Sequence, residues 1–183
     1  DYPDTERELW AIFSKKPFEK MIAMENVSSD FALRELDYAT YFDMLNLDLP
    51  DEKSKILSAF VDDGMVTRND AGNYNITNLG AILFAKRIAD FPSLDRKAVR
   101  VIKYEGMDRI SSASKEQVGG KGYANGFEGL IGYINNLLPN NEILGQAIRK
   151  VVPMYPEIAV RELVANAIVH QNFFMQGTSP LIE

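Results

Sequence analysis

The sequence predicts an α+β fold, and three observations lead to this prediction. Segments with an apolar residue at every third or fourth position, as in amphipathic helices, are interspersed with short runs in which apolar and polar residues alternate. Proline, glycine and asparagine stand at most junctions between these segments. Hydrophobic residues make up 46% of the 183 residues and charged residues 25%, which is the composition of a globular protein with a packed core.

The first 45 residues are expected to form a helix, a strand and two more short helices. The first helix begins with the capping-box pair Thr5 and Glu8 and stops before Pro17. The strand and the next two helices are expected over Lys20–Val27, Ser28–Leu36 and Tyr38–Leu45.

The following stretch has the order helix, hairpin, helix. Pro50 is expected in the first turn of a helix that stops at Gly64. Two short β-type runs follow around a turn at Asn69–Gly72. Thr77 is then expected to cap a helix that continues until Pro92.

This order is typical of a winged-helix unit. We therefore predict a winged-helix-like module over residues 37–90, and residues 1–36 are expected to be a linker or the trailing edge of an upstream domain. The candidate DNA-contacting residues are Lys53 and Lys55 on the helix and Arg68 in the wing. Acidic residues accompany all three in the sequence, which favours a winged helix used for packing or dimerisation over direct DNA contact.

The overall charge limits the classes of partner. Residues 1–70 contain sixteen acidic and eight basic residues, a charge of −8, whereas residues 71–183 contain ten and twelve, a charge of +2. The net charge of −6 argues against non-specific nucleic-acid binding. The chain has no cysteine and no apolar run near the ~20 residues of a membrane span, so we expect a cytoplasmic protein without a membrane partner.

The second half is expected to contain a strand, a glycine-rich turn and two helices. Alternating apolar and charged residues after Pro92 predict the strand. The seven Lys and Arg residues between Asp95 and Lys121, which include Lys97, form a basic strip, and its side chains are expected either to face solvent or to contact phosphate. Gly119–Gly126 lacks the Lys-Ser/Thr pair of a Walker loop and is expected to be a turn. Helices are expected over Phe127–Leu138 and after Pro156.

The last helix contains the segment RELVANAIVHQNF, Arg161–Phe173. Glu162, Asn166 and His170 are spaced i, i+4 and i+8, so they lie along one face of a helix that is otherwise largely apolar. Such a helix is expected to be mostly buried, where a carboxylate needs a partner. An internal polar network, a seam that faces solvent, and a site for a hard cation such as Mg²⁺ are the alternatives.

The same segment resembles one written roughly lREalvNAivHRDY in a bacterial family of transcriptional regulators. Many of these proteins pair a Schlafen/Alba-type DNA-binding domain with a C-terminal GHKL-like ATPase domain, and they are often labelled RecG-like helicases. The resemblance extends from about Leu36 to the end through ITNLGAILFAK, VRVIKYEGMDR and Tyr155-Pro156. It implies that residues 91–183 are the first part of an incomplete GHKL-like α/β two-layer domain, and that the chain is a central segment of a longer protein.

The resemblance also implies roles for the polar seam. Glu162 would be the general base toward the attacking water, Asn166 would ligate Mg²⁺, and Asn166 and His170 would contact the nucleotide. HQNF stands here where the family has HRDY, so an Arg that could contact phosphate is missing. Mg²⁺ and ATP are therefore candidate cofactors of the longer protein, and none is expected in this chain, which lacks an adenine-binding Asp-x-Gly-x-Gly segment and a glycine-rich lid.

The sequence thus predicts a DNA-binding transcriptional regulator that is gated by a nucleotide or a protein partner. One alternative is a Mg²⁺-dependent ATPase formed by the longer protein. The other is a structural interaction or dimerisation module. The expected partners are DNA, bound through the longer protein, and a second copy of the chain.

Overall fold

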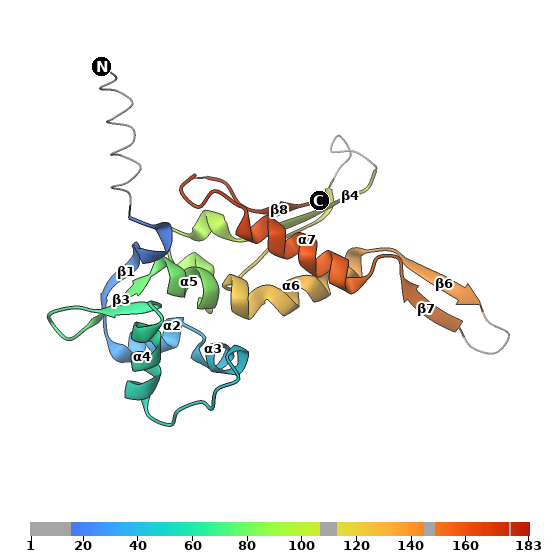
Figure 1. Cartoon of the computed structure of the whole chain (residues 1–183). Coiled ribbons are helices and arrows are strands. Elements are labelled where there is room, and N and C mark those ends of the chain that lie inside the picture. The colour runs from blue at the N-terminus through green and yellow to red at the C-terminus, as the bar shows by residue number, and fades with distance from the viewer. Residues whose placement is uncertain (1–15, 107–112, 145–148, 176) are drawn as a thin grey trace, which may run out of the picture.

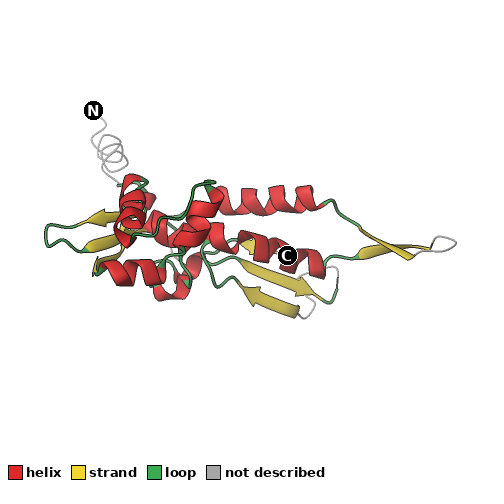
Figure 2. Cartoon of the chain, turned by 90° about the horizontal axis from the view of Figure 1, so that it is seen from below, coloured by secondary structure: helices red, strands yellow, loops and turns green. Residues whose placement is uncertain are grey.

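The protein has a mixed α+β fold, which confirms the predicted class. A computed structural model describes residues 16–106, 113–144, 149–175 and 177–183. Within these residues there are six α-helices, two three-stranded sheets and one β-hairpin (Figure 1). The helices occupy the middle of the molecule, and the hairpin projects from one end (Figure 2). The helix expected to begin at Thr5 lies outside the described residues.

The first unit combines a three-stranded antiparallel sheet with four short helices. The strand order is β1-β3-β2, and β1 pairs with β3 from Ile22↔Thr77 to Val27↔Tyr74. The sequence predicts that the winged-helix-like module begins at residue 37. Because β1 (Ile22–Val27) belongs to the same sheet as β2 and β3, the observed unit begins earlier in the chain. Its elements are β1 (Ile22–Val27), α2 (Ser29–Glu35), α3 (Tyr38–Met44), α4 (Lys53–Asp62), β2 (Val66–Arg68), β3 (Tyr74–Thr77) and α5 (Asn78–Phe84).

Helix caps and one glycine set the boundaries of these elements. The Thr77 hydroxyl accepts a hydrogen bond from the N–H of Gly80 at 3.1 Å, as the sequence predicts. Gly64 has a φ of +72° and ends α4, because its N–H donates to the carbonyl of Val61 at 3.0 Å. Ser28 and Asp37 cap α2 and α3 in the same way as Thr77 caps α5.

Two predicted boundaries in this unit are wrong. Pro50 precedes α4 rather than standing in its first turn, since the backbone is still extended at Glu52 (φ −91°, ψ 124°). Helix α5 stops at Phe84 instead of continuing to Pro92. Ala85 forms a β-bridge with Leu36 there, and this tertiary contact ends the helix.

The second unit contains a small sheet, two longer helices and the projecting hairpin. Strand β4 confirms the strand expected after Pro92, and it pairs antiparallel with β5 and parallel with β8. Helix α6 starts at Tyr123, four residues before the predicted start. The elements are β4 (Arg100–Tyr104), β5 (Ala113–Val118), α6 (Tyr123–Leu137), β6 (Asn140–Leu144), β7 (Arg149–Pro153), α7 (Glu157–Val169) and β8 (Leu181–Ile182). Two short 3₁₀ turns, at Ile88–Asp90 and Asp95–Lys97, lie between α5 and β4, and a third, at Phe18–Lys20, precedes β1.

The two units share one hydrophobic core and meet where α5 packs against the start of α6. Gly122, which precedes α6, donates its N–H to the carbonyl of Ala85 at 2.9 Å. The amide of Asn125 also donates to the carbonyl of Ala85, at 3.0 Å, and to a carboxylate oxygen of Asp37, at 3.4 Å. The backbones of the two units are therefore in direct contact.

No helix among the described residues is long and apolar enough to cross a bilayer.

Candidate functional site

Helix α7 carries the predicted polar seam, but it is far less buried than its composition suggests. Only Val160, Val164 and Ile168 are buried, against the rest of the core. Leu163 and Val169 remain 71% and 67% exposed. The prediction of a mostly buried helix is therefore wrong. In the described residues, α6 is the main neighbour of α7, so one face is covered and the others meet solvent.

The three seam residues lie at the surface on consecutive turns. Glu162, Asn166 and His170 are all exposed. The amide Nδ2 of Asn166 donates to Oε1 of Glu162 at 3.4 Å, so the predicted one-turn spacing brings these two side chains together. His170 ends the helix and donates its N–H to the carbonyl of Asn166 at 3.0 Å. The seam therefore faces solvent and is not part of a buried polar network.

The donor set of the seam suits a hard cation but cannot enclose one. A carboxylate and an amide oxygen are ligands that Mg²⁺ accepts. The described residues contain no group of three or more His, Cys, Asp or Glu side chains that could hold a metal ion. If Mg²⁺ is held by Glu162 and Asn166, its remaining ligands must be water and the oxygens of a bound phosphate.

A buried polar network anchors the segment after α7. The Lys97 side chain is 4% exposed, and its ammonium donates to the carbonyls of Asn172 and Met175 at 3.2 and 2.8 Å. The Tyr123 hydroxyl donates to the carbonyl of Lys97 and accepts from Nε2 of Gln171, which lies 2.9 Å away. Burial lowers the pKa of Lys97 and raises the pKa of Tyr123 to about 12.

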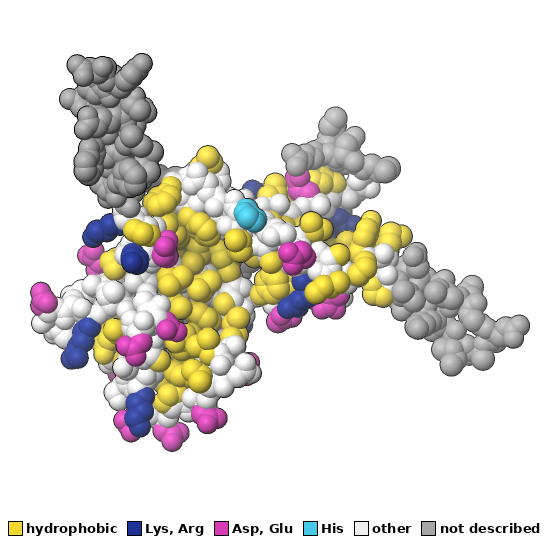
Figure 3. Space-filling view, in the orientation of Figure 1, with side chains coloured by type: hydrophobic (Ala, Val, Ile, Leu, Met, Phe, Trp, Pro, Cys, Tyr) yellow, Lys and Arg dark blue, Asp and Glu magenta, His cyan; other side chains and the backbone are white. Residues whose placement is uncertain are grey.

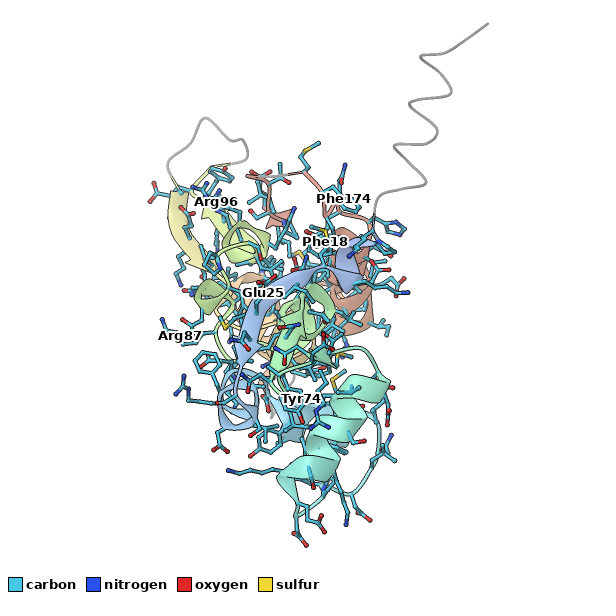
Figure 4. The ribbon with its side chains drawn as sticks, turned by 90° about the vertical axis from the view of Figure 1, so that its left-hand side faces the viewer. Phe18, Glu25, Tyr74, Arg87, Arg96 and Phe174 are labelled. Carbon is cyan, nitrogen blue, oxygen red and sulfur yellow. The ribbon has the colours of Figure 1, made fainter. Side chains whose placement is uncertain are left out.

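This network was missed by sequence reasoning, which placed Lys97 in a basic strip at the surface. The pattern of residues offers no signal for it, because the burial of Lys97 depends on where the segment after α7 passes. Phe173 of the same segment stacks on Phe18 with ring centroids 5.0 Å apart, and Phe174 meets Phe18 edge-on at 6.0 Å (Figure 4). Gln171, Asn172 and Phe173 therefore make contacts within the protein.

The two candidate DNA-contacting lysines are held by acidic neighbours. Nζ of Lys53 lies 2.5 Å from a carboxylate oxygen of Asp30, and Nζ of Lys55 lies 2.9 Å from one of Glu52. The hydrogen bond to Asp30 raises the pKa of Lys53. Arg68 is exposed on β2. Two of the three candidate cations are thus already paired with carboxylates.

The turn between α3 and α4 exposes apolar side chains instead. Met44, Leu45, Leu47 and Leu49 are between 47% and 56% exposed. Asp43 and Asp48 stand among them in the sequence and are also exposed. An apolar surface bordered by carboxylates is typical of a protein-interaction site rather than of a DNA-binding face.

Comparisons with known proteins show one similar fold and identify no family. No protein-family model matches the chain, and no curated protein matches it. The fold is similar to the crystal structure of the DIP2311 protein from Corynebacterium diphtheriae, with a TM-score of 0.50 and 21% sequence identity. The match covers 96% of this chain and 33% of that protein, so the chain spans about a third of its length. At this identity the similarity concerns the fold alone.

Proposed function

We propose that this chain is the coupling segment of a DNA-linked transcriptional regulator that is gated by a nucleotide or a protein partner. In this proposal a winged-helix-like unit is joined rigidly to the first part of a GHKL-like domain. The strand order β1-β3-β2, with α2, α3 and α4 before the β2–β3 hairpin, supports the winged-helix assignment. The resemblance of α7 to the family segment supports the second assignment.

The observation that carries the proposal is the exposed pair of Glu162 and Asn166 on α7. The two side chains are one helical turn apart and in contact at 3.4 Å, so both can reach one phosphate-bound Mg²⁺ from solvent. When bound, the ion would neutralise phosphate charge, and Glu162 would orient or deprotonate a water. Because α6 connects α7 to α5, a ligand on α7 could be sensed by the winged-helix-like unit.

A nucleotide-binding measurement tests this proposal in a longer protein that contains the chain. We expect Mg²⁺–ATP to raise its melting temperature, because a ligand that binds only the folded state stabilises it. Asn166→Ala should weaken this binding by about tenfold, since it removes a metal ligand, a cost of about 1.4 kcal/mol. Asn136→Ala, an exposed asparagine on α6, is the matched control and should leave it unchanged.

The ATPase alternative is tested in the same protein. Glu162→Gln should abolish Mg²⁺-dependent ATP turnover, because a glutamine amide cannot accept the proton of the attacking water. If the unaltered protein shows no ATP turnover, the ATPase function is excluded. If neither nucleotide nor Mg²⁺ shifts the melting temperature, the seam does not bind a nucleotide and the gating part of the proposal fails.

An interaction module is the second candidate function. The exposed apolar turn between α3 and α4 and the ion-paired state of Lys53 and Lys55 favour it. In this function the winged-helix-like unit contacts a protein, and DNA is bound elsewhere in the regulator.

A charge-matched pair of variants tests whether α4 can contact DNA. Asp30→Asn combined with Glu52→Gln removes the ion-pair partners of Lys53 and Lys55, so we expect tighter binding of duplex DNA. A plot of the logarithm of the association constant against the logarithm of the salt concentration should become steeper by about 2. Asp48→Asn with Glu105→Gln makes the same change in net charge at two exposed carboxylates that are not the ion-pair partners of these lysines. An equal effect of both double variants would show that net charge alone is responsible and that α4 has no specific role.

A further inference from the structure

A cavity lies between the start of α6, the paired strands β4 and β5, and the end of α7. Its volume is about 380 Å³, and small-molecule sites usually measure about 300–1,000 Å³. Val99, Val101 and Ile168 form a buried apolar wall, since each is at most 8% exposed. No residue of α3 or α5 lines the cavity, so it is separate from the hydrophobic surface that Figure 3 shows over these two helices.

Aromatic side chains of α6 line the cavity as well. Tyr123 is buried, whereas Phe127 and Tyr133 are only partly buried. Aromatic rings favour one another in offset-stacked or edge-on arrangements, with an attraction beyond that of burial alone. An aromatic ligand would therefore gain contacts in this cavity that a compound of the same size without a ring would not.

Glycines of α6 leave this space free. Gly126 and Gly129 are three residues apart, so they share a face of the helix, and both line the cavity. A Cβ added at Gly129 would meet no heavy atom within 4 Å. Glycine inside a helix is less stable than alanine, and close packing does not require it at this position. Its effect here is to widen the cavity.

Two polar groups at the cavity have no partner in the part of the chain that the structure describes. Lys121 is exposed and forms no ion pair there, and it is the one charged residue among the described residues that line the cavity. Oδ1 of Asn125 is buried without a hydrogen-bond donor, although Nδ2 of the same amide donates to Ala85 and Asp37. A ligand with a negative charge and a hydroxyl group would satisfy both.

We propose that this cavity binds a small aromatic carboxylate that also carries a hydroxyl group. The rings of α6 contact its aromatic body, Lys121 pairs with its carboxylate, and Oδ1 of Asn125 accepts from its hydroxyl. The inference goes beyond the proposed function, because this ligand is not the nucleotide. Neither Glu162 nor Asn166 lines the cavity, and a single lysine does not balance the charge of a polyphosphate.

A ligand in this cavity would contact the joint between the two units. Asn125 lines the cavity and also donates to Ala85 and to Asp37, which belong to the first unit. Gly122, which lines it too, donates its N–H to the same carbonyl of Ala85. The ligand should therefore bind the folded chain alone and raise its melting temperature.

Calorimetric titration and thermal melting of the chain with 4-hydroxyphenylacetate test the chemistry of the ligand. We expect a dissociation constant at or below about 1 mM, which suits a ligand of this size. The neutral 4-hydroxyphenylacetamide, and phenylacetate, which lacks the hydroxyl, should each bind at least about fivefold more weakly. Lys121→Met should reduce the affinity for the acid to that for the amide. Lys20→Met, at an exposed lysine that does not line the cavity, should leave it unchanged.

A matched pair of leucine variants tests the place of binding. Gly129→Leu fills the cavity, so the affinity for 4-hydroxyphenylacetate should fall at least about tenfold. Gly132→Leu makes the same change in α6, again with no heavy atom within 4 Å of the Cβ, but Gly132 does not line the cavity and binding should persist. Far-UV circular dichroism verifies that both variants are folded.

Three outcomes overturn the proposal. The first is the absence of binding by the unaltered chain at about 5 mM 4-hydroxyphenylacetate. The second is that the amide or phenylacetate binds as tightly as 4-hydroxyphenylacetate does, since the cavity would then not recognise the carboxylate or the hydroxyl. The third is an equal loss of binding in Gly129→Leu and Gly132→Leu, because the probe would then bind elsewhere on the chain.

Discussion

Replacing Gly122 with alanine is expected to lower the free energy of unfolding by about 1–3 kcal/mol. A Cβ at this position would lie 2.4 Å from the carbonyl oxygen of Leu83 and 2.6 Å from its carbonyl carbon. Both are backbone atoms of α5, so the clash cannot be relieved by a change of side-chain rotamer. The two units must move apart, and the hydrogen bond from Gly122 to Ala85 must lengthen.

Gly129→Ala is the matched control for this variant. Gly129 lies in α6, and a Cβ added there would have open space around it, with no heavy atom within 4 Å. Alanine at this position should therefore raise stability by about 0.5–1 kcal/mol through helix propensity. Chemical denaturation measures both changes. If Gly122→Ala were neutral or stabilising, α5 and α6 would not be in the close contact that the coupling proposal requires.

Replacing Tyr123 with phenylalanine is expected to destabilise the protein by about 1–3 kcal/mol at neutral pH. The variant removes the hydrogen bond to the buried carbonyl of Lys97 and the acceptor for Gln171. Tyr123 is only 8% exposed, so water cannot readily replace these bonds. Tyr155→Phe, at a tyrosine that is 50% exposed, should have little effect.

The same hydroxyl should make stability depend on alkaline pH. Burial raises the pKa of Tyr123 from 10.0 to about 12, so the folded state binds its proton more tightly than the unfolded state does. The resulting stability is fully present below pH 10 and is lost as the pH rises to about 12, a change of about 2–3 kcal/mol. Burial and Asp63 raise the pKa of Tyr41 as well, in the same direction.

Denaturation midpoints measured from about pH 8 to about pH 12 test this dependence. The unaltered protein should lose stability over the upper part of this range. Tyr123→Phe should lose less, because the contribution of Tyr123 is removed while that of Tyr41 remains. If the two curves run parallel throughout, the ionisation of Tyr123 is not linked to folding, and the buried network at Lys97 does not exist in solution.

Several elements could be predicted because their signals are local. The cap at Thr77, the helix stop at Gly64 and the turn at Asn69–Gly72 each involve residues within a few positions of one another, and all are present. The contact between Glu162 and Asn166 follows from one helical turn of spacing in the same way. Such predictions need no knowledge of the rest of the chain.

The errors arise where distant residues decide the outcome. Helix α5 ends at Phe84 because Leu36, far away in the sequence, pairs with Ala85. Lys97 is buried because Asn172 and Met175 pass over it with their carbonyls toward its ammonium. Neither event leaves a pattern in the residues around it.

By itself, the sequence determined the α+β class, most helix and strand positions in the first unit, and the shared face of the seam on α7. Only the tertiary structure decided that the seam on α7 faces water, that the side chain of Lys97 is buried, and that α3 stands opposite α6 and α7. The physical reason is that periodicity states which side chains share a face, whereas burial depends on whether another surface covers that face.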